Sequence, residues 1–308
     1  MKYAKDTRPK GVSHKAAEVL VEALPWIKNI TGKTVVIKYG GSAMVDAQLR
    51  ADVMNDIVLL KIVGVNPVIV HGGGKAITEA MEFVNLPVEF KDGQRVTTPE
   101  AMDLVRTVLM GKVNQELVEA LNEHGNFAVG VSGADAGVIV AEQASPDLGR
   151  VGHITRINRP LLDDLVNADY IPVVASVALG EDGGFYNVNA DMVAGHIAAA
   201  IGAHKVVFLT DVDGLYENFE NKDSLISNLT LFEAQYMIEN NVVSTGMIPK
   251  LKSCVTALDA GVFRAHILNG TTPHSLLLEL LTSTGVGTTM HSTEEACKFD
   301  SHPLGNFA

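Results

Sequence analysis

The stretch Thr34-Val-Val-Ile-Lys-Tyr-Gly-Gly-Ser-Ala-Met44 decides the fold, because it joins a short β-branched run to a glycine turn. The apolar residues 35–37 are typical of a buried strand. Lys38 therefore lies at the carboxyl end of a strand, beside Gly40 and Gly41. Open α/β sheets bind ligands at this edge, where glycine lets backbone amides approach an anion and lysine supplies a positive charge. For this stretch alone, an ordinary turn with a solvated lysine is the alternative.

The same pattern recurs at two other places in the chain. The apolar residues 68–70 lead through His71 into the glycine run 72–74, and a helix over residues 76–83 follows. The apolar run 206–209 leads into Thr210-Asp-Val-Asp-Gly214. Because the carboxyl ends of parallel strands meet at one edge of a sheet, these turns together predict a phosphate-handling crevice.

Strands alternate with helices along most of the chain. A helix over residues 47–63 connects the first two strands and predicts a right-handed β-α-β unit. The alternation predicts an α/β fold, a three-layer αβα sandwich with a mainly parallel central sheet. Residues 143–156 are expected to form a loop. A further helix is expected at 97–110, starting with a capping box at Thr97. Other helices are expected at 113–124, 163–168, 192–201, 231–240, 250–260 and 274–281. Further strands are expected at 138–141, 171–177 and 265–268.

An amphipathic helix is expected before the first strand. From Ser13 onwards, apolar residues recur at spacings of three and four, up to Ile27. Pro25 lies inside this helix and predicts a kink or break near Leu24. The apolar stripe needs another surface to cover, either on its own domain or on another subunit. The stripe consists of Ala17, Leu20, Leu24 and Ile27.

Composition excludes several classes of protein. The chain has 308 residues, of which 47% are hydrophobic and 19% charged, an ordinary globular balance. Its net charge of −12 gives no general attraction to nucleic acid. Cys254 and Cys297 lack metal-ligand spacing and are expected to be reduced thiols. The chain shows neither a secretory signal nor an apolar run of about 18 residues, so a cytoplasmic protein without membrane contact is expected.

Two familiar nucleotide motifs are absent. Gly32-Lys33-Thr34 ends like a P-loop, but the first glycine of that motif would fall on Ile27, and the triplet precedes a strand instead of following one. The glycine run after His71 is not Gly-x-Gly-x-x-Gly, because residue 77 is Ile77. A Walker A site is therefore rejected, and a Rossmann dinucleotide site is not expected.

Six short motifs follow one another in a characteristic order, and together they resemble the amino acid kinase superfamily and, within it, the N-acetylglutamate kinase family. The resemblance covers roughly residues 15–290. It implies ATP-dependent phosphorylation of the side-chain carboxylate of N-acetyl-L-glutamate, the second step of arginine biosynthesis. A carboxylate is already ionised at pH 7, so this reaction requires no general base. The motifs are Lys38-Tyr-Gly-Gly41, His71-Gly-Gly-Gly74, Gln94-Arg-Val-Thr97, Asn187-Val-Asn-Ala-Asp191, Thr210-Asp-Val-Asp-Gly214 and Gly246-Met-Ile-Pro-Lys250.

The resemblance assigns a role to each motif. It implies that Lys38 and Lys250 contact the transferring phosphoryl group and that Asp191 holds both lysines in place. Mg²⁺ is expected to arrive with ATP and to need few protein ligands, in line with the absence of a metal-binding motif. The implied substrate-binding residues are Gly72, Gly73, Arg95, Asn187 and Asn189, and the implied nucleotide-binding residues are Gly40, Gly41, Thr210, Asp211, Gly214, Tyr216 and Met247.

The resemblance also implies regulation. The helix before the first strand is similar to the extra helix of the arginine-inhibited members, in which it joins dimers into a hexamer. His266, Glu279 and Gly285 lie in segments that resemble the arginine site of those enzymes. L-Arginine is therefore an expected inhibitor and a homo-oligomer an expected assembly, with a PII-type signalling protein as a further candidate partner. The polar insertion at residues 217–224 has no implied role.

The expected organisation is an N-terminal extension, residues 1–30, and one kinase domain, residues 31–308. Within that domain, an acetylglutamate lobe covers about 31–185 and a nucleotide lobe about 186–308. The alternatives are another member of the superfamily, such as a glutamate 5-kinase or aspartokinase, and a non-catalytic arginine sensor. The sequence shows no appended domain after residue 290, and a pure sensor has no need for two lysines at the phosphate end of a crevice.

Overall fold

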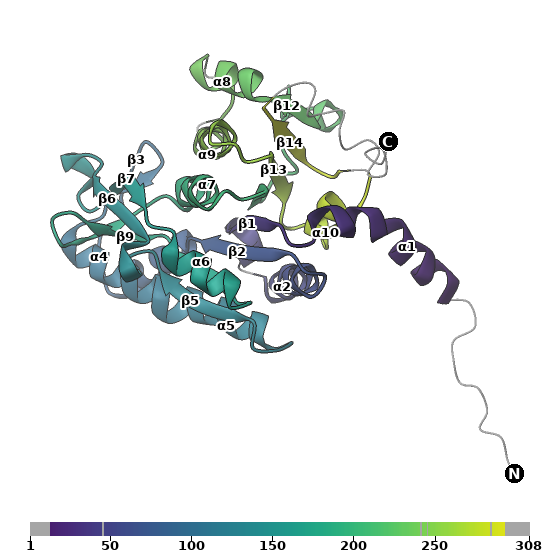
Figure 1. Cartoon of the computed structure of the whole chain (residues 1–308). Helices are drawn as coiled ribbons and strands as arrows, with labels where there is room; N and C mark the ends of the chain where they lie inside the picture. The colour runs from purple at the N-terminus through teal and green to yellow at the C-terminus, as the bar shows by residue number, and fades with distance from the viewer. Residues whose placement is uncertain (1–12, 45, 241, 245, 284, 293–308) are drawn as a thin grey trace, which may run out of the picture.

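The computed structural model describes residues 13–44, 46–240, 242–244, 246–283 and 285–292, and it has the expected three-layer architecture (Figure 1). Eight strands of the described residues form the central sheet. They are parallel except for the pair β13–β14, which confirms the mainly parallel α/β fold. In spatial order the strands are β12 (Asn228–Thr230), β14 (Thr288–His291), β13 (Arg264–Asn269), β11 (Lys205–Thr210), β1 (Thr34–Tyr39), β2 (Asn66–His71), β8 (Ile171–Ala175) and β5 (Ala128–Ser132).

Helices cover both faces of this sheet. Side chains alternate along β1, so Val35 and Ile37 join the core on one face and Val36 joins the core on the other. The first face is covered by α2 (Ala47–Ile62), α3 (Gly74–Phe83), α4 (Pro99–Arg106), α5 (Gln115–Asn122) and α10 (Ser275–Leu281), and the second by α6 (Pro160–Asn167), α7 (Ala190–Ile201), α8 (Leu231–Glu239) and α9 (Ile248–Asp259).

A second, smaller sheet corrects two sequence-based expectations. Residues 143–156 are not a plain loop, because they contain most of β7 (Gly152–Ile157), which pairs antiparallel with β6 (Ile139–Gln143). The expected strand 171–177 ends at Ala175, and β9 (Val177–Gly180) belongs to the smaller sheet. The strands of this sheet are short, and β7 mixes polar with apolar residues, so it lacks the apolar run of a central strand. β10 (Phe185–Asn187) completes the set of four among the described residues.

The two helices expected between residues 97 and 124 form one continuous helical run. The segment η2 (Thr107–Asn114) joins α4 to α5 as a π-helix. The N-cap is Thr98, whose Oγ1 accepts a hydrogen bond from the Ala101 amide at 3.2 Å, so the capping box expected at Thr97 was wrong. The Thr97 hydroxyl donates to the carbonyl of Arg95 instead, at 3.0 Å. Before this run, β3 (Phe90–Lys91) and β4 (Gln94–Arg95) form a short hairpin.

The N-terminal helix α1 (Ser13–Ile30) continues through Pro25, so the expected break near Leu24 does not occur. Its last turn packs on the body of the protein, where Ile30 is 1% exposed. Farther towards the N-terminus, the apolar stripe leaves the body (Figure 1). Leu20 and Leu24 of the stripe are 66% and 62% exposed, and their apolar neighbours Val19 and Val21 are 63% and 70% exposed. The stripe therefore covers its own domain at one end and remains uncovered at the other.

Two smaller expectations concern membranes and cysteines. Of the helices in the described ranges, none combines the length and the apolar character needed to cross a membrane. Cys254 is a free, buried cysteine on α9, as expected for a reduced thiol. Cys297 lies outside the described residues.

Candidate active site

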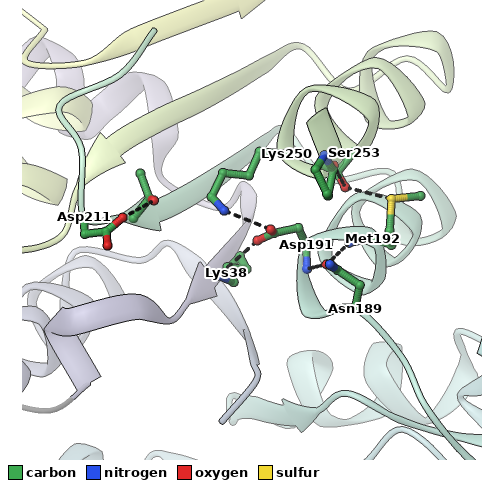
Figure 2. A network of polar contacts seen from close by, with 9 residues as sticks. Lys38, Asn189, Asp191, Met192, Asp211, Lys250 and Ser253 are labelled. Carbon is green, nitrogen blue, oxygen red and sulfur yellow. Dashed lines mark hydrogen bonds and ion pairs between the residues drawn. The ribbon is translucent and has the colours of Figure 1, made fainter. Parts of the chain in front are cut away.

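Three charged residues from distant parts of the chain meet beside the central strand (Figure 2). The Lys38 ammonium lies 3.0 Å from Oδ1 of Asp191, and the Lys250 ammonium lies 3.1 Å from Oδ2 of the same carboxylate. The Lys250 contact also has hydrogen-bond geometry, whereas the Lys38 contact is an ion pair. The side chains of Lys38, Asp191 and Lys250 are only 11%, 8% and 15% exposed. One carboxylate thus holds two ammonium groups at the same edge of the sheet.

Local structure explains how Asp191 reaches this position. It lies in the first turn of α7, where the helix dipole favours a negative charge. Asn189 is the N-cap, and its side-chain oxygen accepts hydrogen bonds from the amides of Asp191 and Met192 at 2.8 and 3.4 Å. Asn189, a predicted substrate ligand, therefore also fixes the start of the helix that carries Asp191.

Close packing of α7 on α9 brings Lys250 to Asp191. A Cβ added to Gly195 would lie 2.6 Å from the carbonyl oxygen of Ser253, so the two backbones approach more closely than any other residue would allow. Lys250 is in the first turn of α9, one residue after Pro249. The spacing between the lysine and the aspartate thus depends on a glycine that contributes no side chain to the cluster.

The electrostatics of the cluster favour a charged Asp191. Burial alone would raise the pKa of this carboxyl group, because it disfavours the anion. The ammonium groups of Lys38 and Lys250 outweigh burial and hold the pKa of Asp191 below its usual value. The cluster therefore carries one net positive charge at neutral pH.

The glycines of the first turn make room for the lysine and for an anion. A Cβ on Gly40 would lie 2.6 Å from Nζ of Lys38, so this side chain folds back over the turn in the space that glycine leaves. Gly41 has φ of +76°, a conformation that favours glycine, and its own Cβ position faces the Asp211 amide at 3.9 Å. The first and third predicted turns therefore lie against each other.

Two adjoining cavities open at this edge of the sheet. The larger has a volume of about 690 Å³ and includes Lys38 and the glycines 40–41 and 72–74 in its lining. The smaller, of about 240 Å³, lies between the second glycine turn and α7, and Arg95, Asn187, Asn189 and Asp191 line it. The structure thus brings Lys38, Asp191 and the predicted substrate-binding residues to one crevice, and Lys250 joins them through its contact with Asp191.

Arg95 and Asn187 belong to the smaller cavity. Arg95 is 7% exposed and donates to the carbonyl of Gly74 at 2.9 Å and to the hydroxyl of Thr78 at 2.6 Å. Burial lowers its pKa, although a guanidinium remains charged at neutral pH. Asn187 donates from Nδ2 to the Thr97 hydroxyl at 3.3 Å. Arg95 is thus held by α3, and Asn187 is held by the segment before α4.

The predicted nucleotide residues after β11 form a separate group. Thr210 donates to Asp211 at 3.2 Å, and Figure 2 shows Asp211 apart from the three charged residues. Tyr216 donates to Asp213 at 2.6 Å, and this hydrogen bond raises the pKa of the tyrosine to about 12. Gly214 packs tightly, because its Cβ would lie 2.4 Å from the Thr288 hydroxyl. Met247 is the half-buried N-cap of α9.

The insertion at residues 217–224 packs against this group. The Lys222 ammonium lies 4.6 Å from the ring centre of Tyr216 and 4.0 Å from that of Phe219. The two rings meet edge to face, with centres 5.8 Å apart. The insertion therefore has a structural contact with a predicted nucleotide residue, which the sequence did not indicate.

The three residues of the predicted arginine site lie together near α10. Oε1 of Glu279 contacts Nδ1 of His266 at 2.8 Å. Oε2 accepts hydrogen bonds from the amides of Val286 and Gly287 at 2.8 and 3.3 Å, and a Cβ on Gly285 would lie 2.8 Å from it. Burial would raise the pKa of Glu279, but the contact with His266 and the donated hydrogen bonds lower it to about 2. In this structure, both carboxylate oxygens have partners within the chain.

Sequence reasoning missed several polar residues of the crevice. Asn114 and His71 are both fully buried behind the second glycine turn. Arg50, Lys75 and Lys112 line the larger cavity. The π-helical segment, which places Lys112 and Asn114, gave no sign in the periodicity, since apolar spacing does not distinguish it from an α-helix. His71 could have been singled out, because it precedes three consecutive glycines.

The crevice fits a metal that enters with a nucleotide. Within the described ranges, no group of three or more His, Cys, Asp or Glu side chains could hold a metal ion. Asp191, a buried carboxylate of the crevice, is occupied by two lysines. Mg²⁺ commonly keeps several waters and is bound through substrate phosphates, so a site of this composition suits it.

Comparison with known proteins identifies the family. The model of the amino acid kinase family matches residues 33–269. The chain belongs to the amino acid kinase family. Within the family it is similar to acetylglutamate kinases, with 50% identity to that of Caldanaerobacter subterraneus subsp. tengcongensis over 88% of this chain and 92% of the relative. The acetylglutamate kinase of Petrotoga mobilis is 49% identical over the same shares.

Solved structures agree with the fold of this amino acid kinase. The protein smu.665 of Streptococcus mutans UA159 is 29% identical, with a TM-score of 0.71 over 84% of this chain and 99% of its own. The N-acetylglutamate synthase of Neisseria gonorrhoeae, complexed with coenzyme A and N-acetylglutamate, has a TM-score of 0.78 over 90% of this chain and 63% of its own. At 24% identity, that second likeness concerns the fold alone.

Proposed function

We infer that this chain transfers the γ-phosphoryl group of ATP to the side-chain carboxylate of N-acetyl-L-glutamate, forming N-acetyl-L-glutamyl 5-phosphate and ADP in arginine biosynthesis. The observation that carries this conclusion is the identity of about one half with acetylglutamate kinases over 88% of the chain. The Lys38–Asp191–Lys250 cluster supports it, because transfer of this kind requires positive charge at the edge of a crevice.

The chemistry requires positioning and charge, since the nucleophile is already an anion. A carboxylate has a pKa near 4 and needs no base at pH 7. The difficulty is the approach of this anion to a polyanion, and phosphoryl-transfer catalysis consists largely of orientation and electrostatic stabilisation. We propose that Lys38 and Lys250 contact the transferring group. Asp191 keeps both ammonium groups oriented, and its own pKa, which lies below the usual value, keeps it charged while it does so.

The smaller cavity is the proposed site of N-acetylglutamate. Its size suits a small amino acid derivative, and Arg95 has N–H groups beyond those bonded to Gly74 and Thr78 with which to bind an α-carboxylate. Asn187 and Asn189 are proposed to bind the same substrate, and Gly72 and Gly73 to donate backbone amides to it.

The nucleotide is proposed to lie over the turns after β1 and β11. Gly40 and Gly41 would face the phosphates, while Thr210, Asp211, Gly214, Tyr216 and Met247 would surround the rest of the nucleotide. A divalent metal is expected of a kinase that uses ATP, and we propose that this metal is Mg²⁺. It would be held by the phosphates and water and would neutralise part of their charge.

We further propose inhibition by L-arginine and a homo-oligomer, with the hexamer as the expected form. The proximity of His266, Glu279 and Gly285 supports the arginine site. Because the Glu279 oxygens already have partners, a guanidinium would have to replace some of them, for example the amides of Val286 and Gly287. The exposed stripe of α1 supports the assembly. The two-lobe division, a cytoplasmic location and a PII-type partner stay predictions.

A coupled assay of ADP release tests the substrate and the regulation together. Mg-ATP is supplied with N-acetylglutamate, glutamate or aspartate, with and without L-arginine. We expect turnover with N-acetylglutamate alone and a lower rate with arginine. Turnover with free glutamate or aspartate would contradict the substrate assignment of Arg95 and Asn187. Arginine binding without turnover of any substrate would indicate a sensor instead of an enzyme.

A further inference from the structure

A buried chain of hydrogen bonds ends on the second glycine turn. Asn114, the last residue of η2, donates from Nδ2 to the carbonyl of Val173 on β8 at 2.8 Å. The same Nδ2 lies 2.9 Å from Nε2 of His71. On the other side of the ring, Nδ1 of His71 lies 3.0 Å from the carbonyl oxygen of Gly72. Asn114 and His71 are 0% exposed.

The order of donors along this chain is fixed by Val173. A backbone carbonyl only accepts hydrogen bonds, so the Asn114 group that faces it must be the NH₂ group. The opposite orientation of the amide would place two oxygens against each other. Within the described residues, Oδ1 of Asn114 has no hydrogen-bond partner. At this position the side chain is therefore used for its two N–H groups.

The tautomer of His71 follows. Since Nδ2 of Asn114 donates, Nε2 of His71 must accept. Burial lowers the pKa of His71 to about 4, so the ring is neutral at pH 7 and carries one proton. That proton is on Nδ1, from which it is donated to the carbonyl of Gly72.

We propose that His71 and Asn114 are positioning residues, which hold the peptide group between Gly72 and Gly73 so that the Gly73 amide faces the crevice. The carbonyl of a trans peptide points away from the following N–H, so a carbonyl held towards the buried ring directs the Gly73 amide to the opposite side. Gly73 is the N-cap of α3 and has no side-chain cap, which leaves the first amides of the helix for an anion. This inference rests on the proposed role of Gly72 and Gly73 in substrate binding.

Packing around the turn fits the same role. A Cβ on Gly73 would lie 2.8 Å from Leu109 and 3.2 Å from Val113, both on η2. The π-helical segment therefore supports the turn with apolar contacts and with Asn114. Gly130 on β5 gives Asn114 its space, since a Cβ there would lie 2.0 Å from Oδ1. Such π-helical turns are frequent at functional sites.

Solid-state NMR of the full-length protein with ¹⁵N-labelled histidine tests the tautomer directly. The His71 signal is assigned as the one that disappears in His71→Asn. We expect a neutral ring with its proton on Nδ1, unchanged from pH 6 to pH 8. A proton on Nε2, or a charged ring, would overturn the proposal. This readout does not depend on turnover, so it remains informative if the proposed substrate is wrong.

Two matched substitutions test the consequence for catalysis. Asparagine can place an N–H near the position of Nδ1, whereas glutamine places its amide near Nε2. We expect His71→Gln to lower kcat by about 100-fold, as loss of an aligned backbone donor does, and His71→Asn to retain at least about a tenth of the wild-type kcat. His124→Asn, at an exposed contact with Asn55, is the control and is expected to behave as wild type. If both His71 variants lost kcat equally, in step with a fall in their melting temperatures, His71 would have a structural role and the proposal would be rejected.

Discussion

At the scale of single residues, we expect turnover to depend on the cluster around Asp191. Asp191→Asn keeps the shape of the side chain but removes the charge that holds Lys38 and Lys250 together. We expect kcat for N-acetylglutamate to fall by about 100-fold or more, because two unneutralised ammonium groups would repel each other and lose their alignment. Steady-state kinetics measure the effect.

The matched control for this substitution is Asp169→Asn. Asp169 also pairs with a lysine, Lys61 at 2.5 Å, but its side chain is 86% exposed and it lies outside the crevice. We expect the control to leave kcat unchanged. A kcat of Asp191→Asn within about threefold of wild type would show that the lysines hold their positions without the carboxylate.

The sequence indicated the charged residues of the site but not their support. Lys38 is identifiable because it follows a β-branched run and precedes glycines, and Asp191 and Lys250 because they lie in short motifs in a fixed order. The buried pair His71 and Asn114 was missed, since no local rule relates residues 43 positions apart. Partners of this kind depend on how β2 and η2 pack, which only the folded chain shows.

At the scale of secondary-structure elements, the contact between α7 and α9 sets the geometry of the site. Gly195→Ala places a methyl group 2.6 Å from the Ser253 carbonyl, so the helices must separate. We expect the free energy of unfolding to fall by about 1 to 3 kcal/mol and kcat to fall with it, because Lys250 moves away from Asp191. Chemical denaturation and kinetics measure the two effects.

Gly111→Ala is the control for that change in stability. Gly111 is also helical, but a Cβ there meets nothing within 4 Å. Alanine at such a position is expected to leave stability unchanged or to raise it by up to about 1 kcal/mol. If Gly195→Ala were as stable as Gly111→Ala, the close approach of α7 and α9 would not be needed for the stability of the fold.

The contact between α2 and α10 makes stability depend on pH. Asp56 on α2 is 1% exposed, and Oδ1 contacts Nδ1 of His274 at 2.6 Å. Burial raises the pKa of Asp56 to about 6, although His274 opposes the shift. A group with a raised pKa stabilises the fold below its ordinary pKa, and this contribution is lost as the pH rises through the raised value.

Asp56→Asn removes that dependence. We expect the variant to be more stable than wild type by about 3 kcal/mol at pH 8, a difference that vanishes towards pH 4. Urea denaturation across this range measures it, with the exposed Asp259→Asn as control. A difference between Asp56→Asn and wild type that is the same at both pH values would contradict the raised pKa.

Elements with long apolar runs were predictable, whereas short or irregular ones were not. The buried strands β1, β2 and β11 and their glycine turns follow from β-branched runs. The strand β7 has a mixed burial pattern, and β14 comes after the last predicted strand, so neither had a clear signal. Pro25 lies inside the single helix α1, so it does not break the helix there.

At the scale of the whole molecule, the uncovered face of α1 bears on assembly and regulation. The double substitution Leu20→Asp and Leu24→Asp places charges on a stripe that is otherwise apolar and exposed. We expect a smaller particle by light scattering and weaker inhibition by arginine. Turnover of N-acetylglutamate should persist, since the crevice lies on the central sheet.

Phe232→Asp on α8 is the control, because Phe232 is also apolar and is 77% exposed. It is expected to leave particle size unchanged. An unaltered particle for the α1 variant would remove the proposed role of α1 in the oligomer. A smaller particle with full arginine inhibition would support the role of α1 in assembly and contradict its link to regulation.

The central position of β1 also determines when the enzyme becomes active during its synthesis. One neighbour of β1, β2, follows within 40 residues, but the other, β11, begins at Lys205, and Lys250 comes later still. Until then a nascent chain exposes one edge of β1, which is open to pairing with other chains. The ribosome must therefore translate most of the message before the chain can bury that edge and complete the pair of lysines. A protein truncated before residue 250 would lack the second lysine altogether.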